Sequence, residues 1–248
     1  MSNNDIVDRA LSSTKEELGG EDREKHIVRA VKMMDRLEAS IAEKEEDFKE
    51  WYRLHFPELV EEIDNVEHLV KILGRGVERS ELDSFSGLAE NSKGSALGER
   101  EKEMIESVVE NLESDLELRE ELDDYVRESM SEEASNMTTL TGHILGAKLV
   151  ALAGGLEELA KSPASTVQML GAEKALFRYL RGKGTPPKHG VIFEHRFVNP
   201  LPESERGKMA RFMANKVVMA ARLDVYGDKD KGKELLEECR ERFEELKA

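Results

Sequence analysis

Residues 27–57 read IVRAVKMMDRLEASIAEKEEDFKEWYRLHFP, and the spacing of the apolar side chains in this stretch decides the fold. They recur at alternating steps of three and four residues, which is the period of about 3.5 typical of a coiled-coil seam. Lys44 is the one misfit in the pattern. We predict one long helix from Arg23 to Phe56, ended by Pro57. Its predicted seam residues are Ile27, Met34, Leu37, Ile41, Phe48 and Trp51.

A second long helical pattern follows at residues 99–130, after a segment, 59–98, that glycines interrupt repeatedly. Two long helices of similar length joined by a compact tip predict an antiparallel coiled-coil hairpin. Two amphipathic helices in an ordinary bundle are the alternative interpretation. The predicted seam residues of the second helix are Ile105, Val109, Leu112 and Leu116.

The second half of the chain has a different texture, with small residues crowded into 146–155 as close helix packing requires. The pattern there predicts a helix over 164–180, a glycine- and proline-rich loop over 181–190, an extended segment over 191–197, and helices over 203–223 and 230–246. We therefore expect a predominantly all-α protein. Its expected parts are a short polar leader (1–22), the hairpin (23–135, with its tip at 59–98) and a helical domain (136–248).

Charge is distributed unevenly along the chain. The 248 residues carry a net charge of −16, and 36% of them are charged. Residues 136–226 nevertheless hold 13 Lys or Arg against 7 Asp or Glu, which leaves 24 basic and 46 acidic residues elsewhere. Such asymmetry indicates that the basic part binds a polyanion.

Patterns that carry catalysis or hold a cofactor are missing from the sequence. The six histidines are scattered, no metal-ligand spacing occurs, and no G-x-S-x-G presents a serine nucleophile. Residues 227–234 fit G-x-x-x-x-G-K, but Glu234 stands where a P-loop has Ser or Thr, so we read this stretch as a helix-capping turn. The sequence predicts a protein without catalytic residues, metal or cofactor.

The sequence also points to a cytoplasmic protein that does not cross a membrane. Cys239 is the only cysteine, so the chain has no internal disulfide framework, which suits a reducing compartment. Residues 1–20 lack the apolar core of a signal peptide, and no stretch approaches the length of a membrane span.

The strongest functional signal lies between residues 170 and 190. Lys174, Arg178 and Arg181 are spaced to lie on one helix face, and the loop beyond adds Lys183 and Lys188. Five cations at one corner of a domain suit a phosphate backbone, and the neighbouring His189 suits stacking on an unpaired base. A solvated charged face beside an ordinary loop is the alternative.

Several stretches resemble the Nop domain of archaeal box C/D ribonucleoprotein core proteins. Residues 171–178 read GAEKALFR and residues 186–190 read PPKHG, which together resemble the family's signature. ALAGGL, PASTVQML and RGKMAR, which begin at Ala151, Pro163 and Arg206, resemble the same family, as does WYRLHFPEL from Trp51. The resemblance covers about residues 23–226 in the family's order.

The resemblance implies a non-catalytic RNA-binding scaffold. Family members recognise a kink-turn RNA that already carries a small ribosomal-protein-like subunit, form dimers through their coiled coils, and bring the methyltransferase fibrillarin to box C/D guide RNAs for 2′-O-methylation. Carried over, residues 171–174 would contact the protein–RNA junction, 175–178 would continue toward the guide, and 183–189 would face RNA. The implied RNA-binding set is Gly171, Ala172, Glu173, Lys174, Ala175, Leu176, Phe177, Arg178, Arg181, Lys183, Pro186, Pro187, Lys188, His189, Lys208 and Arg211.

The chain departs from the family pattern at its N-terminus. About 22 residues precede the predicted coil, where fibrillarin-docking members carry a folded domain, and that is too few for an independent core. Direct fibrillarin recruitment therefore stays open. The alternatives are a truncated paralogue that no longer recruits the methyltransferase, a coiled-coil module whose basic patch binds an acidic protein, and an enzyme that handles phosphate through Lys233.

Overall fold

The protein is all-α, as the sequence predicts. The computed structural model describes residues 3–227 and 230–247, and over this part of the chain it contains helices and no strand. The first seven elements are α1 (Asn3–Tyr52), α2 (Pro57–Glu62), α3 (Val66–Leu73), η1 (Arg79–Glu81), η2 (Asp83–Phe85), α4 (Ser86–Glu90) and α5 (Glu99–Glu133). The others are α6 (Ser135–Thr141), α7 (His143–Ala153), α8 (Leu156–Lys161), α9 (Ala164–Met169), α10 (Glu173–Leu180), η3 (Val191–Glu194), α11 (Glu203–Tyr226) and α12 (Gly232–Lys247).

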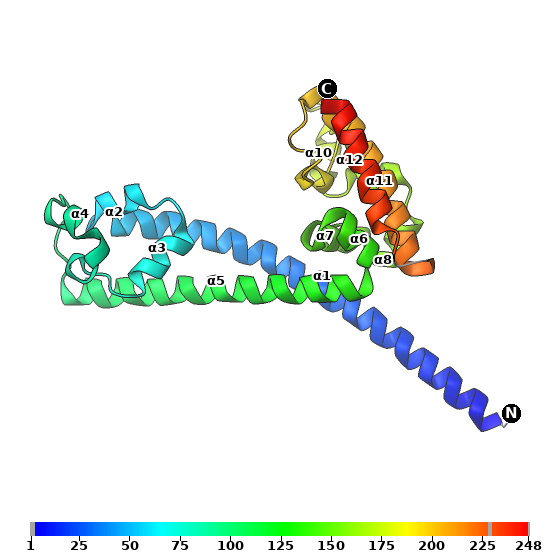
Figure 1. Cartoon of the computed structure of the whole chain (residues 1–248), viewed down its shortest axis with the longest axis horizontal. Helices are drawn as coiled ribbons and strands as arrows, with labels where there is room; N and C mark the ends of the chain where they lie inside the picture. Colours follow the sequence, from blue (N-terminus) through cyan, green and yellow to red (C-terminus); the bar gives the residue numbers. More distant parts are fainter. Residues whose placement is uncertain (1–2, 228–229, 248) are drawn as a thin grey trace. The chain divides into compact units, whose positions relative to one another are not determined.

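The chain divides into two compact units. One is residues 33–122, and the other combines residues 1–32 with 123–248. Helices α1 and α5 each contribute residues to both units (Figure 1).

The unit 33–122 is a helical hairpin. The parts of α1 and α5 that belong to it run antiparallel and share one apolar core, and α2, α3 and α4 gather at the end where the chain turns (Figure 1). The tip is fastened to α1 by the Tyr52 hydroxyl, which donates a hydrogen bond of 2.8 Å to the carbonyl oxygen of Val77. The apolar side chains that recur along the two long helices thus form the core of the hairpin, and the Tyr52 hydrogen bond attaches its tip.

Nine of the ten predicted seam residues are buried. Met34 is buried in the hairpin, and Ile27 is buried in the other unit. The shared core of the hairpin contains Leu37, Ile41, Phe48, Ile105, Val109, Leu112 and Leu116.

The prediction is wrong for Trp51, which is 38% exposed. Its neighbour Tyr52 is fully buried instead. An α-helix has about 3.6 residues per turn, so its buried face drifts away from a pattern of about 3.5. After Phe48 the buried position therefore lies four residues on, and the polar end of Tyr52 has the Val77 carbonyl as its acceptor.

Lys44, the charged residue in the apolar pattern, has partners on the facing helix. Its ammonium nitrogen lies 2.6 Å from Asp115 Oδ2 and 2.7 Å from Asn111 Oδ1. Its side chain is 39% exposed, so the apolar stem lies beside the core while the charged end reaches the edge.

Helix α1 begins at Asn3 and ends at Tyr52, earlier at both ends than the predicted bounds of 23 and 56. Helix α1 ends at Tyr52 because residues 54–55 contact the loop at residues 94–95 of the hairpin tip. The carbonyl of Leu54 accepts from the backbone N–H of Ser95 at 2.8 Å, and a Cβ on Gly94 would lie 1.8 Å from the carbonyl oxygen of His55. The chain therefore leaves the helical path where the loop at 94–95 packs against it.

The unit of 1–32 with 123–248 is organised around α11. This helix packs against α6, α8, α9, α12 and η3, and its buried face includes four alanines that allow close approach: Ala210, Ala214, Ala220 and Ala221. The predicted helices over 203–223 and 230–246 are confirmed as α11 and α12.

Two predictions about local structure in this unit are wrong. The expected helix over 164–180 is two helices, α9 and α10, interrupted at residues 170–172. Gly171 has φ +81°, a left-handed conformation that ends a helix, and an added Cβ there would lie 2.4 Å from Val191 Cγ1. The expected extended segment over 191–197 begins as the 3₁₀ helix η3.

The turn before α12 packs closely against α6 at Gly232. Within the near-P-loop stretch 227–234, Asp228 and Lys229 lie outside the described residues. Gly232 is buried, and a Cβ there would lie 2.8 Å from Thr139 Cβ and 3.0 Å from Asn136 Cα. Because Gly232 has no side chain, the turn can pack closely against α6 at this position. None of the described helices is both long and apolar enough to span a membrane.

His195 is buried after η3 and makes the stability of this unit depend on pH. Its Nδ1 accepts from the Phe197 N–H at 3.1 Å, so its protonated Nε2 donates to the Leu140 carbonyl at 3.1 Å. Burial lowers the pKa of His195 below its usual 6.5. The unfolded chain therefore takes up this proton at higher pH than the folded chain does, and stability is lost as the pH falls below about 6.5.

We expect the melting temperature of this unit to fall between pH 7.5 and 5.5, and His195→Gln to reduce that difference. Thermal unfolding followed by circular dichroism measures both effects. His68→Gln, at an exposed position of the hairpin, is the control and should retain the full pH difference. Equal pH dependence in His195→Gln and the native protein would contradict the assignment.

Candidate nucleic-acid interface

Residues 171–190 form a projecting segment whose two ends lie side by side, because residues 190–191 pair with residues 168–170. These ends are joined by two backbone hydrogen bonds of 2.8 Å, from Gly190 N to Gln168 O and from Val191 N to Leu170 O. The Gln168 amide adds a bond of 2.7 Å to the Lys188 carbonyl. We call residues 171–190 the excursion. Its base is fixed by backbone pairing, which positions the side chains it carries.

Helix α10 forms the outer part of the excursion, and none of its eight residues, all of them described, is buried. Phe177 and Leu180 are 61% and 68% exposed, and Leu176 and Tyr179 are also exposed. Large apolar side chains that a unit leaves in contact with water mark a binding surface. Such side chains stack on bases or pack on proteins, while neighbouring cations bind phosphate.

The start of α10 is held by contacts of the predicted residues themselves. Glu173 Oε1 accepts from the Gly171 N–H at 2.8 Å, Ala172 is buried, and Ala175 is half-buried. These four residues therefore set the direction of α10, and Lys174 and Arg178 are exposed along it. Arg181 follows the helix as its C-cap, and Lys183 lies in the exposed loop beyond.

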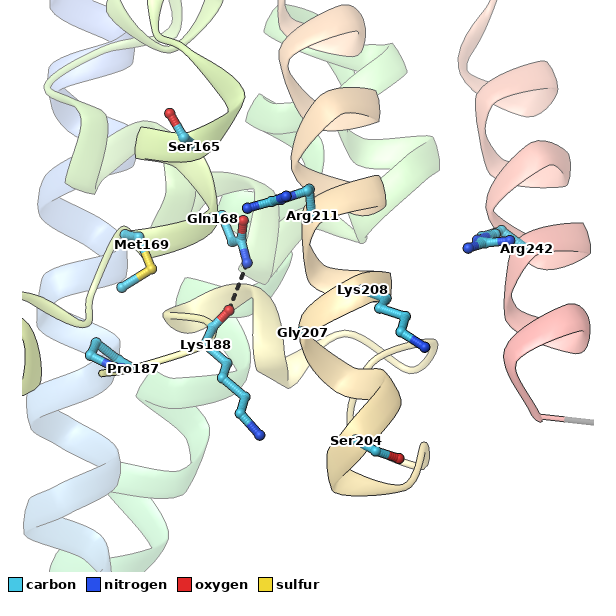
Figure 2. A pocket seen from close by; sticks show the side chains of 10 residues that line it. All are labelled: Ser165, Gln168, Met169, Pro187, Lys188, Ser204, Gly207, Lys208, Arg211 and Arg242. Atoms are coloured by element: carbon cyan, nitrogen blue, oxygen red, sulfur yellow. Dashed lines mark hydrogen bonds between the residues drawn. The ribbon is translucent and has the colours of Figure 1, made fainter. Parts of the chain in front are cut away.

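A groove of about 670 Å³ lies beside the base of the excursion. Four cationic side chains line it: Lys188 from the loop, Lys208 and Arg211 from α11, and Arg242 from α12 (Figure 2). Its other lining residues are Ser165, Gln168, Met169, Pro187, Ser204 and Gly207. The four cations and the polar groups of Ser165, Gln168 and Ser204, which lie beside Met169 and Pro187, have the chemistry of a phosphate site.

Three of these cations have carboxylate partners near them. Lys188 lies 3.6 Å from Glu203, Lys208 lies 2.8 Å from Glu205, and Arg242 lies 2.6 Å from Glu245. At least one side chain of each pair is more than half exposed to water, so each pair is weak and exchangeable. A phosphate can therefore replace a carboxylate at small cost.

His189 is positioned by a stack of side chains. Its ring lies 4.7 Å from that of Phe193 at an interplanar angle of 12°, and the Arg206 guanidinium lies over Phe193 at 5.3 Å. Burial, followed by the charges of Arg206 and Lys188, lowers the pKa of His189 below its usual value. The imidazole is therefore neutral near pH 7 and presents an aromatic surface rather than a charge.

The predicted residues form two sets. Lys188, Lys208 and Arg211 come together in the groove with Pro187, whereas Lys174, Arg178, Arg181 and Lys183 lie on or after α10 and do not line it. Pro186 is exposed in the loop between the two sets. The sequence alone missed Arg242, and it missed the roles of Gln168 and Arg206. Arg242 and Gln168 belong to the interface because segments far apart in the sequence pack together, and a single sequence does not show that packing. Among the described residues, no group of three or more His, Cys, Asp or Glu is arranged to hold a metal ion.

Comparison with protein families settles the lineage. The model of the Nop family, described as "snoRNA binding domain, fibrillarin", matches residues 33–245. The chain belongs to the Nop family. The match covers the hairpin, the excursion and the groove, so the resemblance in the motifs is confirmed over most of the protein.

Relatives of this Nop-family chain occur in archaea and eukaryotes. An uncharacterised NOP5 family protein of Methanocaldococcus jannaschii is 39% identical over 91% of this chain and 58% of its own length. Nucleolar protein 56 of Saccharomyces cerevisiae is 34% identical over 88% of this chain and 47% of its own. The chain thus spans about half the length of the curated relatives it matches.

A solved structure has the same fold. A chain from the crystal structure of a fibrillarin/Nop5p complex matches 98% of this chain, and 78% of its own residues are covered. The TM-score is 0.57 and the sequence identity is 27%.

Proposed function

We propose that this Nop-family chain is a non-catalytic RNA-binding scaffold of a box C/D ribonucleoprotein. It recognises a kink-turn RNA that already carries a small ribosomal-protein-like subunit, and it supports guide-directed 2′-O-methylation of rRNA or tRNA. The observation that carries the proposal is the excursion, which presents exposed apolar and cationic side chains beside a groove lined by four cations.

The two sets of side chains suit a composite target. Cationic side chains bind a phosphate backbone mainly because counterions are released, and this contribution to affinity needs no apolar surface. Leu176, Phe177 and Leu180 on α10 therefore need a second kind of contact, such as a protein surface or the face of a base. A complex of RNA and protein offers both kinds of contact at one junction.

The charge distribution supports the same assignment. Residues 136–226 carry a net charge of about +6, whereas the rest of the chain carries −22. RNA is attracted to the part of the chain that holds the excursion and three of the four groove cations, whereas the acidic remainder repels it. The negative charge outside residues 136–226 thus directs RNA to the excursion and groove instead of opposing RNA binding.

The test is a gel shift with a kink-turn box C/D RNA, with and without its small protein subunit, over a series of salt concentrations. We expect a supershift on the preformed RNA–protein complex only. Binding to the small protein that persists after nuclease treatment, with no RNA requirement, would instead establish a protein-interaction module. Adding fibrillarin to the supershifted complex then tests the methyltransferase as a further partner.

In the same assay we expect Lys174→Ala with Arg178→Ala to weaken the supershift by at least about tenfold and to lower the salt dependence. The double variant Lys32→Ala with Arg36→Ala is a matched control, because it removes two exposed cations at the same spacing on α1. Equal affinity in both double variants would contradict the assignment of α10 to the RNA surface.

A further inference from the structure

Arg242 is the one cation of the groove that comes from α12, and the helix that carries it is firmly held. Leu235 and Cys239 of α12 are buried, and Phe243 stacks on Phe197 with ring centroids 5.2 Å apart. Lys216, which is almost buried on α11, forms an ion pair with Glu238. These contacts hold α12 against α11 and against the segment after η3, so Arg242 has a defined place in the groove wall (Figure 2).

We infer that the groove is a phosphate subsite for the RNA backbone and that Arg242 is one of its binding residues, with Glu245 as a carboxylate that the phosphate displaces. The inference rests on the proposed function and extends it from the excursion to the C-terminal helix. RNA would then cross from the excursion, through Lys188, to α11 and α12.

The geometry of the groove favours a phosphodiester over a compact anion. About 670 Å³ is far more than one phosphate occupies, and the lining cations come from three separate segments. Lys208 and Arg211 lie three residues apart on α11, so both side chains leave the helix on the same side. Arg242 adds a guanidinium from the neighbouring helix, and guanidinium binds phosphate through two parallel hydrogen bonds.

The acidic partners decide the direction of the expected effects. Glu245 lies 2.6 Å from Arg242 and is 63% exposed, so it occupies the guanidinium only weakly when no RNA is present. Neutralising Glu245 removes a competitor and a charge that repels phosphate. Neutralising Arg242 removes the contact itself. Neutralising Glu245 should therefore raise the affinity for RNA, and neutralising Arg242 should lower it.

The experiment compares this pair with a second pair on the same helix. Arg240 and Glu237 lie 3.5 Å apart, both are more than half exposed, and neither lines the groove. Arg240→Gln and Glu237→Gln thus reproduce each change in net charge away from the proposed site. Because salt screens exposed charges over about 8 Å at physiological ionic strength, the control variants should have little effect.

We expect Arg242→Gln to weaken binding to the RNA–protein complex by roughly five- to tenfold and to reduce the slope of log K against log salt by about 0.9. Glu245→Gln should strengthen binding a few-fold. Arg240→Gln and Glu237→Gln should stay within about twofold of the native chain.

Three outcomes would overturn the inference, and they differ from one another. If the native chain binds but Arg242→Gln matches Arg240→Gln, the subsite is refuted while the proposed function stands. If the native chain does not bind the complex, both fail together. If Arg242→Gln weakens binding to the RNA-free partner and leaves the salt slope unchanged, the groove binds acidic protein instead of RNA.

Discussion

Replacing Gly190 with alanine is expected to weaken binding of the RNA–protein complex by at least about tenfold while α11 and its neighbours stay folded. A Cβ at this position would lie 1.8 Å from the carbonyl oxygen of Leu170 and 2.7 Å from its carbon. Backbone atoms cannot yield as a flexible side chain does, so the two chain segments must separate. Separation breaks the bonds from Gly190 to Gln168 and from Val191 to Leu170 that close the excursion.

The loss of binding follows from what the base of the excursion positions. Lys188 and His189 directly precede Gly190, and the Lys188 carbonyl accepts from the Gln168 amide. When the base opens, Lys188 leaves the groove wall and α10 loses its fixed direction. The substitution removes no charge and no side chain, so a fall in affinity would report on position alone.

Gly184→Ala is the matched control within the same loop. Gly184 has φ +87° but no atom within 4 Å of its added Cβ, so alanine there costs about 1 kcal/mol of backbone strain and meets no neighbour. Circular dichroism should show native helix content in both variants, and the gel shift should be lost in Gly190→Ala alone. Similar binding in the two variants would show that closure of the excursion is not what the RNA complex requires.

The long helices and their buried faces are predictable from the sequence, because an apolar period is a local property. The periodicity gives both hairpin helices and the burial of residues such as Ile41 and Leu112. It fails at Trp51, because the buried face of the helix drifts and Tyr52, whose hydroxyl donates to the Val77 carbonyl, is buried in its place. The partners of Lys44 on α5 also cannot be predicted until the alignment of α1 against α5 is known.

The candidate interface is predictable in part. Cations at helical spacing on α10 are visible in the sequence, but the break at Gly171 depends on Val191, twenty residues further along the chain. The groove requires α9, α11 and α12 to meet, so Arg242 has no local signal. Composition located the basic part of the chain, and only packing showed which cations share one surface.

The largest expected effect on stability comes from Asp224, whose carboxylate joins the end of α11 to the start of α6. One oxygen, Oδ1, accepts from the Asn136 backbone N–H at 2.9 Å and from its side-chain amide at 2.8 Å. The other, Oδ2, accepts from the Met137 N–H at 2.9 Å. Asn136 is fully buried, and its own oxygen accepts from the Lys231 N–H at 2.9 Å before α12. One carboxylate thus supports the junction of three helices.

We expect Asp224→Ala to lower the free energy of unfolding of this unit by about 3–5 kcal/mol. The substitution leaves buried N–H groups of Asn136 and Met137 without their acceptor, and it removes hydrogen bonds to a charged group. Asp224→Asn should cost less, about 2–4 kcal/mol, because one amide oxygen can still accept while its NH₂ group faces a donor. The matched control is Asp124→Ala on α5, which breaks an exposed ion pair with Arg127 and should cost less than about 1 kcal/mol.

The two units allow the loss to be located as well as measured. Trp51, the only tryptophan, lies in the hairpin of residues 33–122, so its fluorescence follows unfolding of that unit, whereas circular dichroism follows helix in both. In urea, Asp224→Ala should move part of the circular-dichroism transition to lower concentration and leave the fluorescence transition in place. If the two signals move together, the units unfold as one and the carboxylate stabilises the whole chain. If neither moves, the hydrogen bonds of Asp224 contribute little to the folded state and the helix junction is held by apolar packing.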